Sequence, residues 1–348
     1  MRYLLKNLRR RPAGCLLAEC LLAVALAIVV PAGLSAAPPE PDSGGLLVLD
    51  DSDSEFKGQA TYSDRLTRLD RTGNVTFEIG DFNGCQSIGS SHLIAVDAAR
   101  GSIWVIELVG KRLRRFDRRG RELLTLEDLE ASAAAVDPET GNLWLLTSKG
   151  TIHGDKTCVI DPEGKRLATY TVSGFDIAYD PRGKCFWIVS NQLTKIDAAT
   201  GKVVLQKEIT KWCASSVAVH PRTGQIWVAV REHPQVDNSH NELLVFEEEG
   251  ALADAIPLGE STPFQLSIDS RTGSVWVTIY RRSIQRYSQG GEFEVEVEMP
   301  ALACAADPLT GGVWIVTPDE TIRMGPDGGT ALRRKHTRPS QQAWIATE

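Results

Sequence analysis

One motif occurs six times in this chain and constrains its fold more than any other feature. In each copy an Asp or His opens a short turn, a Gly lies within the turn, and an apolar run with a central Trp follows. The tryptophans are Trp104, Trp144, Trp187, Trp227, Trp276 and Trp314, spaced 40, 43, 40, 49 and 38 residues apart. A period of about 40 residues indicates a tandem array in which each unit buries its apolar face against its neighbours.

Each repeat predicts two β-hairpins. An Asp-Pro pair favours a turn because proline fixes φ and the Asp side chain caps the backbone, and Gly supplies the positive φ that closes it. The apolar run after the Gly is four or five residues long, which is typical of a strand covered on both faces. A second turn of the form apolar-Asp-x-x-Gly follows, as in residues 159–164. Each unit is therefore expected to contain four short strands.

A four-stranded antiparallel sheet at this period predicts an all-β fold, a single β-propeller. The Trp hairpin occurs six times and the second hairpin seven times, because residues 65–75 also match it. Residues 46–50 supply one strand ahead of that match, and the chain ends with the apolar residues 343–346. We therefore expect seven blades, with the C-terminal strand pairing into the N-terminal blade and removing the open edges. Six blades is the alternative if either terminus is disordered.

On these motifs the chain resembles NHL-type and related six- to seven-bladed propellers. The D-P-x-T-G-x-Φ-W-Φ hairpin, where Φ is apolar, followed by I/F-D-x-x-G, is also similar to the repeats of streptogramin-lyase-like, YVTN-type and WD40-like proteins. The resemblance covers residues 46–346. It implies the fold and carries no activity, because the matching residues form turns and pack blades.

The charge of the chain bears on its partners. The 348 residues carry a formal charge of −7, and without the first 36 residues 33 basic and 44 acidic residues remain, a charge of −11. An acidic body argues against a nucleic-acid or anionic-lipid surface. The short basic stretch at residues 333–338 is predicted to be a solvated tail, as most charge runs are.

The N-terminus predicts export. Basic residues 9–11 precede an apolar stretch at 20–30 and a small-residue exit at 33–37, which is the pattern of a secretory signal peptide. We expect residues 1–37 to be that segment, 38–45 to be a linker and 46–348 to be the propeller, with the mature protein periplasmic or secreted.

A second interpretation of the same segment keeps it in the membrane. Gly14 followed by Glu19 in an apolar run resembles the leader of type IV prepilin-like proteins. This resemblance implies a membrane anchor over residues 15–36 and a structural head domain on a pilus-like assembly. Pro31 argues against a long pilin helix.

Seven cysteines fall to five after removal of the leader: Cys85, Cys158, Cys185, Cys213 and Cys304. An odd number cannot all pair within one chain, so at least one stays a thiol or pairs outside it. Their spacing contains no C-x-x-C, and cysteine is readily buried as a small hydrophobe.

Candidate binding residues come from the loops expected to surround the axial channel, opposite the Asp-Pro turns. The longest of these loops, residues 231–240, accounts for the 49-residue spacing. The candidates are Glu107, His153, Asp155, Asn191, Trp212, Arg231, Glu232, His233, Asp237, His240, Tyr280, Arg281 and Asp319. Converging His, Asp and Glu side chains could hold a divalent cation or act as acid and base; inserted polar loops are also common without any such role.

Two functions of different classes follow. The first is a non-catalytic, exported binding module that engages a protein, glycan or small ligand through the axial loop face, with no cofactor and as a monomer. It predicts a shallow polar or aromatic face. The second is a metal-assisted hydrolase or lyase at the axis, which predicts acidic or His side chains within coordination reach of one ion. No residue is assigned a catalytic role, because no nucleophile elbow, H-E-x-x-H or phosphate-binding glycine loop is present.

Overall fold

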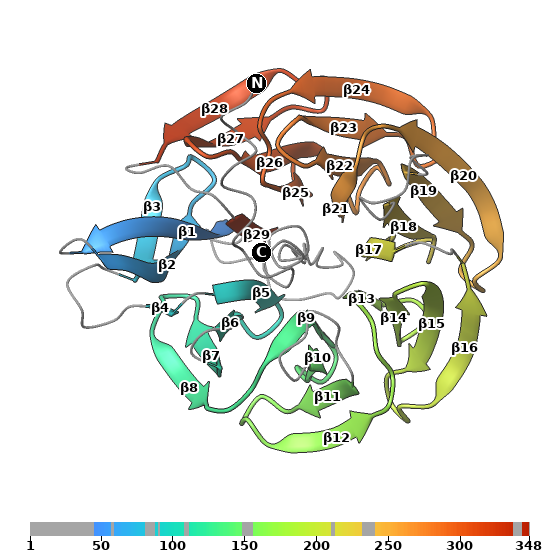
Figure 1. The fold of residues 1–348 in the computed structure, drawn as a ribbon, viewed down its shortest axis with the longest axis horizontal. Helices are drawn as coiled ribbons and strands as arrows, with labels where there is room; N and C mark the ends of the chain where they lie inside the picture. The colour runs from blue at the N-terminus through green and yellow to red at the C-terminus, as the bar shows by residue number, and fades with distance from the viewer. Residues whose placement is uncertain are drawn as a thin grey trace, which may run out of the picture.

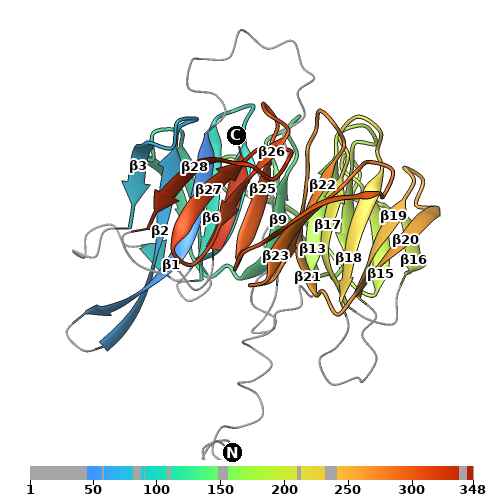
Figure 2. The ribbon, with the colours of Figure 1, turned by 90° about the horizontal axis from the view of Figure 1, so that it is seen from above.

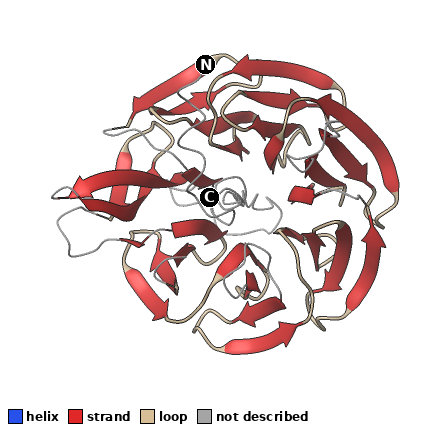
Figure 3. Ribbon diagram, viewed as in Figure 1, coloured by secondary structure: helices blue, strands red, loops and turns tan. Residues whose placement is uncertain are grey.

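A computed structural model describes residues 45–56, 59–80, 88–89, 91–107, 111–147, 156–209, 213–231, 241–336 and 343–347. The secondary-structure elements of these residues are β-strands, joined by tight turns and short loops (Figure 3). They form seven antiparallel sheets, the blades, arranged in a ring around a central axis (Figure 1). The chain is a seven-bladed β-propeller, as the repeats predict.

Blades 1 to 6 each contain four consecutive strands, ordered from the axis outwards. Blade 1 contains β5 (Ser91–Asp97), β6 (Ser102–Glu107), β7 (Arg112–Asp117) and β8 (Glu122–Leu126). Blade 2 contains β9 (Ala131–Val136), β10 (Leu143–Thr147), β11 (Lys156–Ile160) and β12 (Arg166–Tyr170). Blade 3 contains β13 (Asp176–Asp180), β14 (Cys185–Val189), β15 (Gln192–Asp197) and β16 (Val203–Glu208). Blade 4 contains β17 (Cys213–Val219), β18 (Ile226–Arg231), β19 (Asn241–Phe246) and β20 (Leu252–Gly259). Blade 5 contains β21 (Pro263–Ile268), β22 (Val275–Ile279), β23 (Ser283–Tyr287) and β24 (Phe293–Glu298). Blade 6 contains β25 (Ala303–Asp307), β26 (Gly312–Val316), β27 (Glu320–Met324) and β28 (Thr330–Lys335).

Blade 7 joins the two ends of the described chain and closes the ring. Its innermost strand is β29 (Ala343–Thr347), followed outwards by β1 (Leu46–Phe56), β2 (Gln59–Leu69) and β3 (Val75–Ile79), with the short β4 (Ile88–Gly89) on β2. β29 pairs antiparallel with β1 from Leu46↔Thr347 to Asp50↔Ala343. β29 also lies beside β25 of blade 6 and β5 of blade 1. The closure predicted from the terminal apolar segments is therefore confirmed, and the six-bladed alternative is wrong.

The β1–β2 hairpin continues beyond the blade. The two strands stay paired as far as Phe56↔Gln59, well past the residues that pair with β29. The hairpin projects as an arm from the ring, at the lower left of Figure 2. It gives blade 7 an outline that the sequence repeats do not predict.

The core lies in the seams between blades. Trp104, Trp187, Trp227 and Trp276 are fully buried, and Trp144 and Trp314 almost so. Trp276 of blade 5, for example, packs in one cluster with Val313 and Ile315 of blade 6. The tryptophans thus fill the space between neighbouring sheets, where their large apolar area stabilises the ring.

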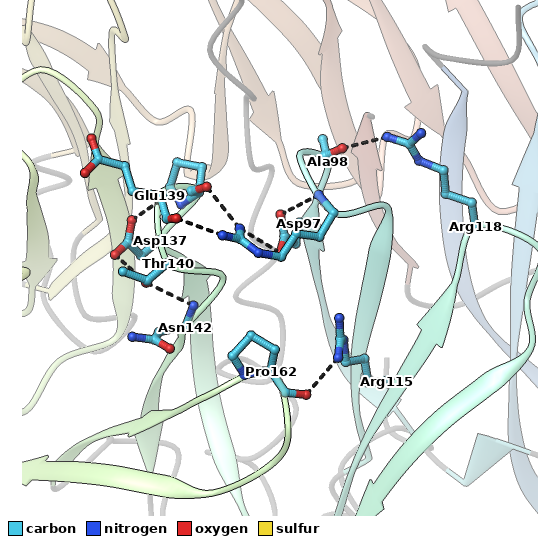
Figure 4. Close-up of polar contacts among 11 residues, drawn as sticks. Asp97, Ala98, Arg115, Arg118, Asp137, Glu139, Thr140, Asn142 and Pro162 are labelled. Carbon is cyan, nitrogen blue, oxygen red and sulfur yellow. Dashed lines mark hydrogen bonds and ion pairs between the residues drawn. The ribbon is translucent and has the colours of Figure 1, made fainter. Parts of the chain in front are cut away.

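The turn between the first and second strands is capped in blades 1 to 6 as the motif predicts, and blade 2 shows the pattern in full. Asp137 accepts the backbone N–H of Glu139 and the hydroxyl of Thr140, whose oxygen accepts the N–H of Asn142 (Figure 4). In blade 4 the imidazole of His220 replaces the carboxylate, and its Nδ1 accepts the N–H groups of Arg222 and Thr223, each at 3.1 Å. Nδ1 is therefore unprotonated, and burial lowers the pKa of His220. His220 therefore caps this turn in the place that Asp holds in the other repeats.

One glycine of the motif does not hold the position expected for it. Gly141 and Gly273 close their turns with φ near +80°, four residues after the capping Asp. In blade 3 the residue at that offset from Asp180 is Lys184, with φ of 46°, and Gly183 precedes it. The turn in this copy is therefore closed by a lysine in the left-handed region, which only a few per cent of non-glycine residues adopt.

Cations on the third strand join neighbouring blades. Each lies over the Trp ring of its own blade and donates a hydrogen bond to a backbone carbonyl in the second turn of the next blade. The four sets are Arg115 over Trp104 to Pro162 O, Lys195 over Trp187 to Glu248 O, Arg286 over Trp276 to Pro326 O, and Arg323 over Trp314 to Arg71 O. Figure 4 shows the bond from Arg115 to Pro162. The last set crosses from blade 6 to blade 7, so this seam is built like those after blades 1, 3 and 5.

Candidate functional site

The described candidate residues lie on the loop face, the ends of the blades opposite the Asp turns. Glu107 and Arg231 end the second strands of blades 1 and 4. Asn191, Tyr280 with Arg281, and Asp319 lie between the second and third strands of blades 3, 5 and 6. The other candidates fall outside the described residues: His153, Asp155, Trp212, Glu232, His233, Asp237 and His240.

The carboxylate of Glu107 is fully buried and held by two arginines. Arg112 donates from Nε and Nη2 to Oε2 at 2.8 and 2.5 Å, and Arg114 donates from Nη1 to Oε1 at 3.2 Å. Arg114 also pairs with Glu122 on the outermost strand. This network crosses three strands of blade 1, and a ligand at Glu107 would have to displace an arginine from a buried carboxylate, which is costly.

Blade 5 presents an aromatic and cationic surface on the loop face, which we call the Tyr280 platform: Phe264, Tyr280 and Arg281. The Phe264 and Tyr280 ring centroids are 4.9 Å apart, and the Arg281 guanidinium carbon lies 5.3 Å from the Tyr280 centroid. Phe264 is buried at the irregularity that opens β21, whereas Tyr280 is 36% exposed and Arg281 is exposed. The buried ring therefore supports an exposed ring beside a positive charge.

Three more candidates occupy the same face in separate blades. Asn191 is exposed and accepts the Ser190 hydroxyl at 3.3 Å. Asp319 is exposed, and its backbone carbonyl accepts the N–H of His336 at 2.7 Å. Arg231 is half-buried and lies opposite Cys213 in the β17–β18 pairing. Each of these contacts joins the candidate to its own blade.

Sequence analysis missed a polar set on the innermost strands. Each of these side chains accepts a hydrogen bond from a backbone N–H of the innermost strand of the next blade. The inner edge of that strand is not paired with another described strand, so its N–H groups need other acceptors. The bonds run from Val217 N to Asp176 (2.9 Å), Leu266 N to Ser216 (3.3 Å), Cys304 N to Gln265 (3.1 Å) and Ala306 N to Ser267 (2.7 Å). They satisfy backbone donors that burial would otherwise leave unpaired.

Asp176 is the one ionisable member of this set. Its Oδ1 accepts the N–H of Ile177, and its Oδ2 accepts the N–H of Val217. Burial raises the pKa of Asp176 to about 7, although these N–H groups and the Ser216 hydroxyl act to lower it. A signal was available in the sequence: Asp176 lies four residues before the turn residue Asp180, where the repeats of blades 2 and 6 have Ala133 and Ala303.

Because the pKa of Asp176 is raised in the native state, ionisation of this carboxyl group should destabilise the fold as the pH rises. The native state binds this proton more tightly than the unfolded chain, so the stabilising contribution is complete below 3.8 and is lost as the pH rises through about 7. Urea denaturation at a series of pH values compares the wild type with Asp176→Asn, which does not titrate. The free energy of unfolding of the wild type, relative to the variant, should fall across this window and then stay constant. A rise across the window would contradict the prediction.

Three further findings concern metals, thiols and membranes. Within the described ranges, no three His, Cys, Asp or Glu side chains are grouped to hold a metal ion. Cys158, Cys185, Cys213 and Cys304 are free thiols, and burial raises the pKa of Cys304 to about 12; Cys85 lies outside the described residues. The same residues contain no helix long and apolar enough to cross a membrane.

Of the comparisons with known proteins, the one with solved structures supports the fold. No family model matches the chain, and no curated protein matches it. Among solved structures, the hydrazine synthase of Kuenenia stuttgartiensis is similar, with a TM-score of 0.60 and 14% sequence identity over 79% of this chain and 90% of that one. At this identity the similarity shows a shared propeller fold and nothing about activity.

Proposed function

We propose that the protein is an exported, non-catalytic binding module that engages its ligand through the loop face. The observation that carries the proposal is the Tyr280 platform. An exposed tyrosine ring with buried aromatic support loses little conformational entropy on binding, since it has only two side-chain torsions. Aromatic and arginine side chains are also the residues most enriched at binding hot spots.

The platform favours a ligand with a flat apolar face and a negative charge. The face of the Tyr280 ring can stack against the apolar face of a sugar, and the Arg281 guanidinium can bind a carboxylate through two parallel hydrogen bonds. An acidic glycan, built from uronic acids, offers both features in one repeating unit. Among the ligand classes open to the protein, we therefore propose an acidic glycan.

Titration calorimetry with oligogalacturonates tests this proposal, with neutral oligosaccharides of equal length as the comparison. We expect binding of the acidic chains, a loss of at least tenfold in affinity in Tyr280→Ala and in Arg281→Gln, and near-normal affinity in Tyr280→Phe. Phe293→Ala, an exposed aromatic residue on the outermost strand of the same blade, is the matched control and should bind normally. Absence of binding, or equal binding by Tyr280→Ala, would overturn the proposal.

Export and repeat family are parts of the same proposal. The basic, apolar and small-residue order of residues 1–37 supports cleavage and release, and the D-P-x-T-G-x-Φ-W-Φ hairpins support a place among NHL-type and streptogramin-lyase-like propellers. Mass spectrometry of the mature protein tests export directly. A mature N-terminus near Ala36 supports it, whereas one at Cys15 would favour the retained anchor.

A further inference from the structure

A small cavity lies in the seam where the ring closes, between blades 6 and 7. In Figure 1 these blades lie side by side, with β27 and β28 next to β1, β2 and β3. The cavity has a volume of about 40 Å³, roughly the room that three water molecules need. Its lining residues are Val48, Arg65, Thr67, Leu69, Glu78, Thr321, Arg334, Lys335 and His336.

The walls of this cavity are positively charged. Blade 7 contributes Arg65, whose Nη1 lies 3.6 Å from Glu78 Oε1. Blade 6 contributes the half-buried Arg334, which no hydrogen bond or ion pair holds among the described residues. Lys335 also borders the cavity, but it is exposed and its side chain lies on the opposite face of β28, with Arg333. Two arginines, one from each blade, thus face the cavity beside Glu78.

Arg333, the neighbour of Arg334 on the same strand, has different surroundings and does not line the cavity. Arg333 lies one residue before Arg334, is 55% exposed and pairs with Glu320 at 2.9 Å. Successive residues of a strand point to opposite faces, so Arg333 and Arg334 face different surroundings. Residues 333–335 of the basic run predicted to be a solvated tail therefore form the end of strand β28, and Arg334 faces the seam.

Neutral polar groups complete the lining. Thr67 and Thr321 are buried at the cavity. His336 Nδ1 lies 3.2 Å from the Pro318 carbonyl, which can only accept, so Nδ1 carries a proton; Nε2 lies 2.9 Å from the Thr321 hydroxyl oxygen. The position of the imidazole is thereby fixed at one edge of the cavity.

We propose that this seam cavity binds a small tetrahedral oxyanion of the phosphate or sulfate class, held by Arg334 of blade 6 and Arg65 of blade 7. Guanidinium groups bind such oxyanions through paired, charge-assisted hydrogen bonds. The volume of the cavity suits one small oxyanion. Because the cations come from both sides of the closing seam, the bound anion bridges the blade that contains both ends of the described chain to its neighbour.

Titration calorimetry with inorganic phosphate, at ionic strength held constant with chloride, tests the proposal. We expect millimolar or tighter binding, a loss of at least tenfold in Arg334→Gln, and a change of less than twofold in Arg333→Gln and in Lys335→Gln. A parallel arm with glucose 6-phosphate separates a free ion from a phosphate ester. Absence of binding by the wild type, or equal losses in Arg333→Gln and Arg334→Gln, would overturn the proposal.

A second measurement, the midpoint of thermal unfolding, distinguishes a loss of phosphate binding from a loss of folding. A ligand that binds only the native state raises the midpoint of thermal unfolding. Phosphate should therefore raise this midpoint in the wild type and in Arg333→Gln more than chloride does, and should leave it unchanged in Arg334→Gln. An equal rise in all three proteins would show a general salt effect and contradict the proposal.

Discussion

Deletion of residues 343–348 is expected to destroy the stable, cooperative fold of this protein. The deletion removes β29, the innermost strand of blade 7, and with it the five paired positions on β1. It also removes the buried Ile345 and Ala346 and exposes the flanks of β25 and β5. The buried apolar side chains alone account for several kcal/mol at about 25 cal/mol per Å², and the uncovered edge of β1 invites association with other chains.

Urea denaturation and size-exclusion chromatography measure this effect. The truncated protein should lose its cooperative unfolding transition or elute as aggregates. A synthetic peptide of residues 343–348, added in excess, should restore part of the transition, because it can pair with β1 in the vacated place. A truncated protein that stays monomeric and unfolds like the wild type would contradict the closure.

Replacement of a seam tryptophan is expected to have the second-largest effect. Trp276 is fully buried against blade 6, and the Arg286 guanidinium carbon lies 5.6 Å from its ring centroid. Trp276→Ala leaves a cavity between two rigid sheets and should cost about 3–5 kcal/mol of unfolding free energy. Denaturant titration measures this value.

The matched control lies in the same blade. Phe293 is 56% exposed on β24, so Phe293→Ala should change the free energy of unfolding by about 0.5 kcal/mol or less. Trp276→Phe, which keeps part of the apolar volume, should fall between the two. Equal costs for Trp276→Ala and Phe293→Ala would show that the tryptophan does not fill the seam.

The fold was predictable because each repeat has the same turn residues and the same short apolar strand. The turn residues fix where strands begin, the Trp marks the second strand, and the unmatched apolar ends predict how the ring closes. Even His220 could be placed correctly, because its position in the turn identifies it as a substitute for Asp. Local departures were harder: in blade 3 the residue with positive φ is Lys184, although Gly183 is its neighbour.

The candidate site was predictable only as a face of the ring. Loop positions follow from strand order, which places Tyr280 and Asp319 on one side. Contacts within and between blades do not follow from a repeat period: the arginines around Glu107 come from the adjoining strand, and the partner of Asp176 comes from the next blade. The seam cavity joins Arg334 to Arg65, which are far apart in the sequence. The candidates in loop 232–240 stay predictions.

Hydrogen exchange of individual backbone amides, followed by mass spectrometry or NMR, tests the closed ring most directly. If the N- and C-terminal strands complete a seventh blade, amides paired between β1 and β29 should exchange as slowly as those of β13 and β14 in blade 3, and should open in the same cooperative unit. Rapid exchange in Leu46–Asp50 and Ala343–Thr347, with the other six blades protected, would show that the ring is not closed by its termini.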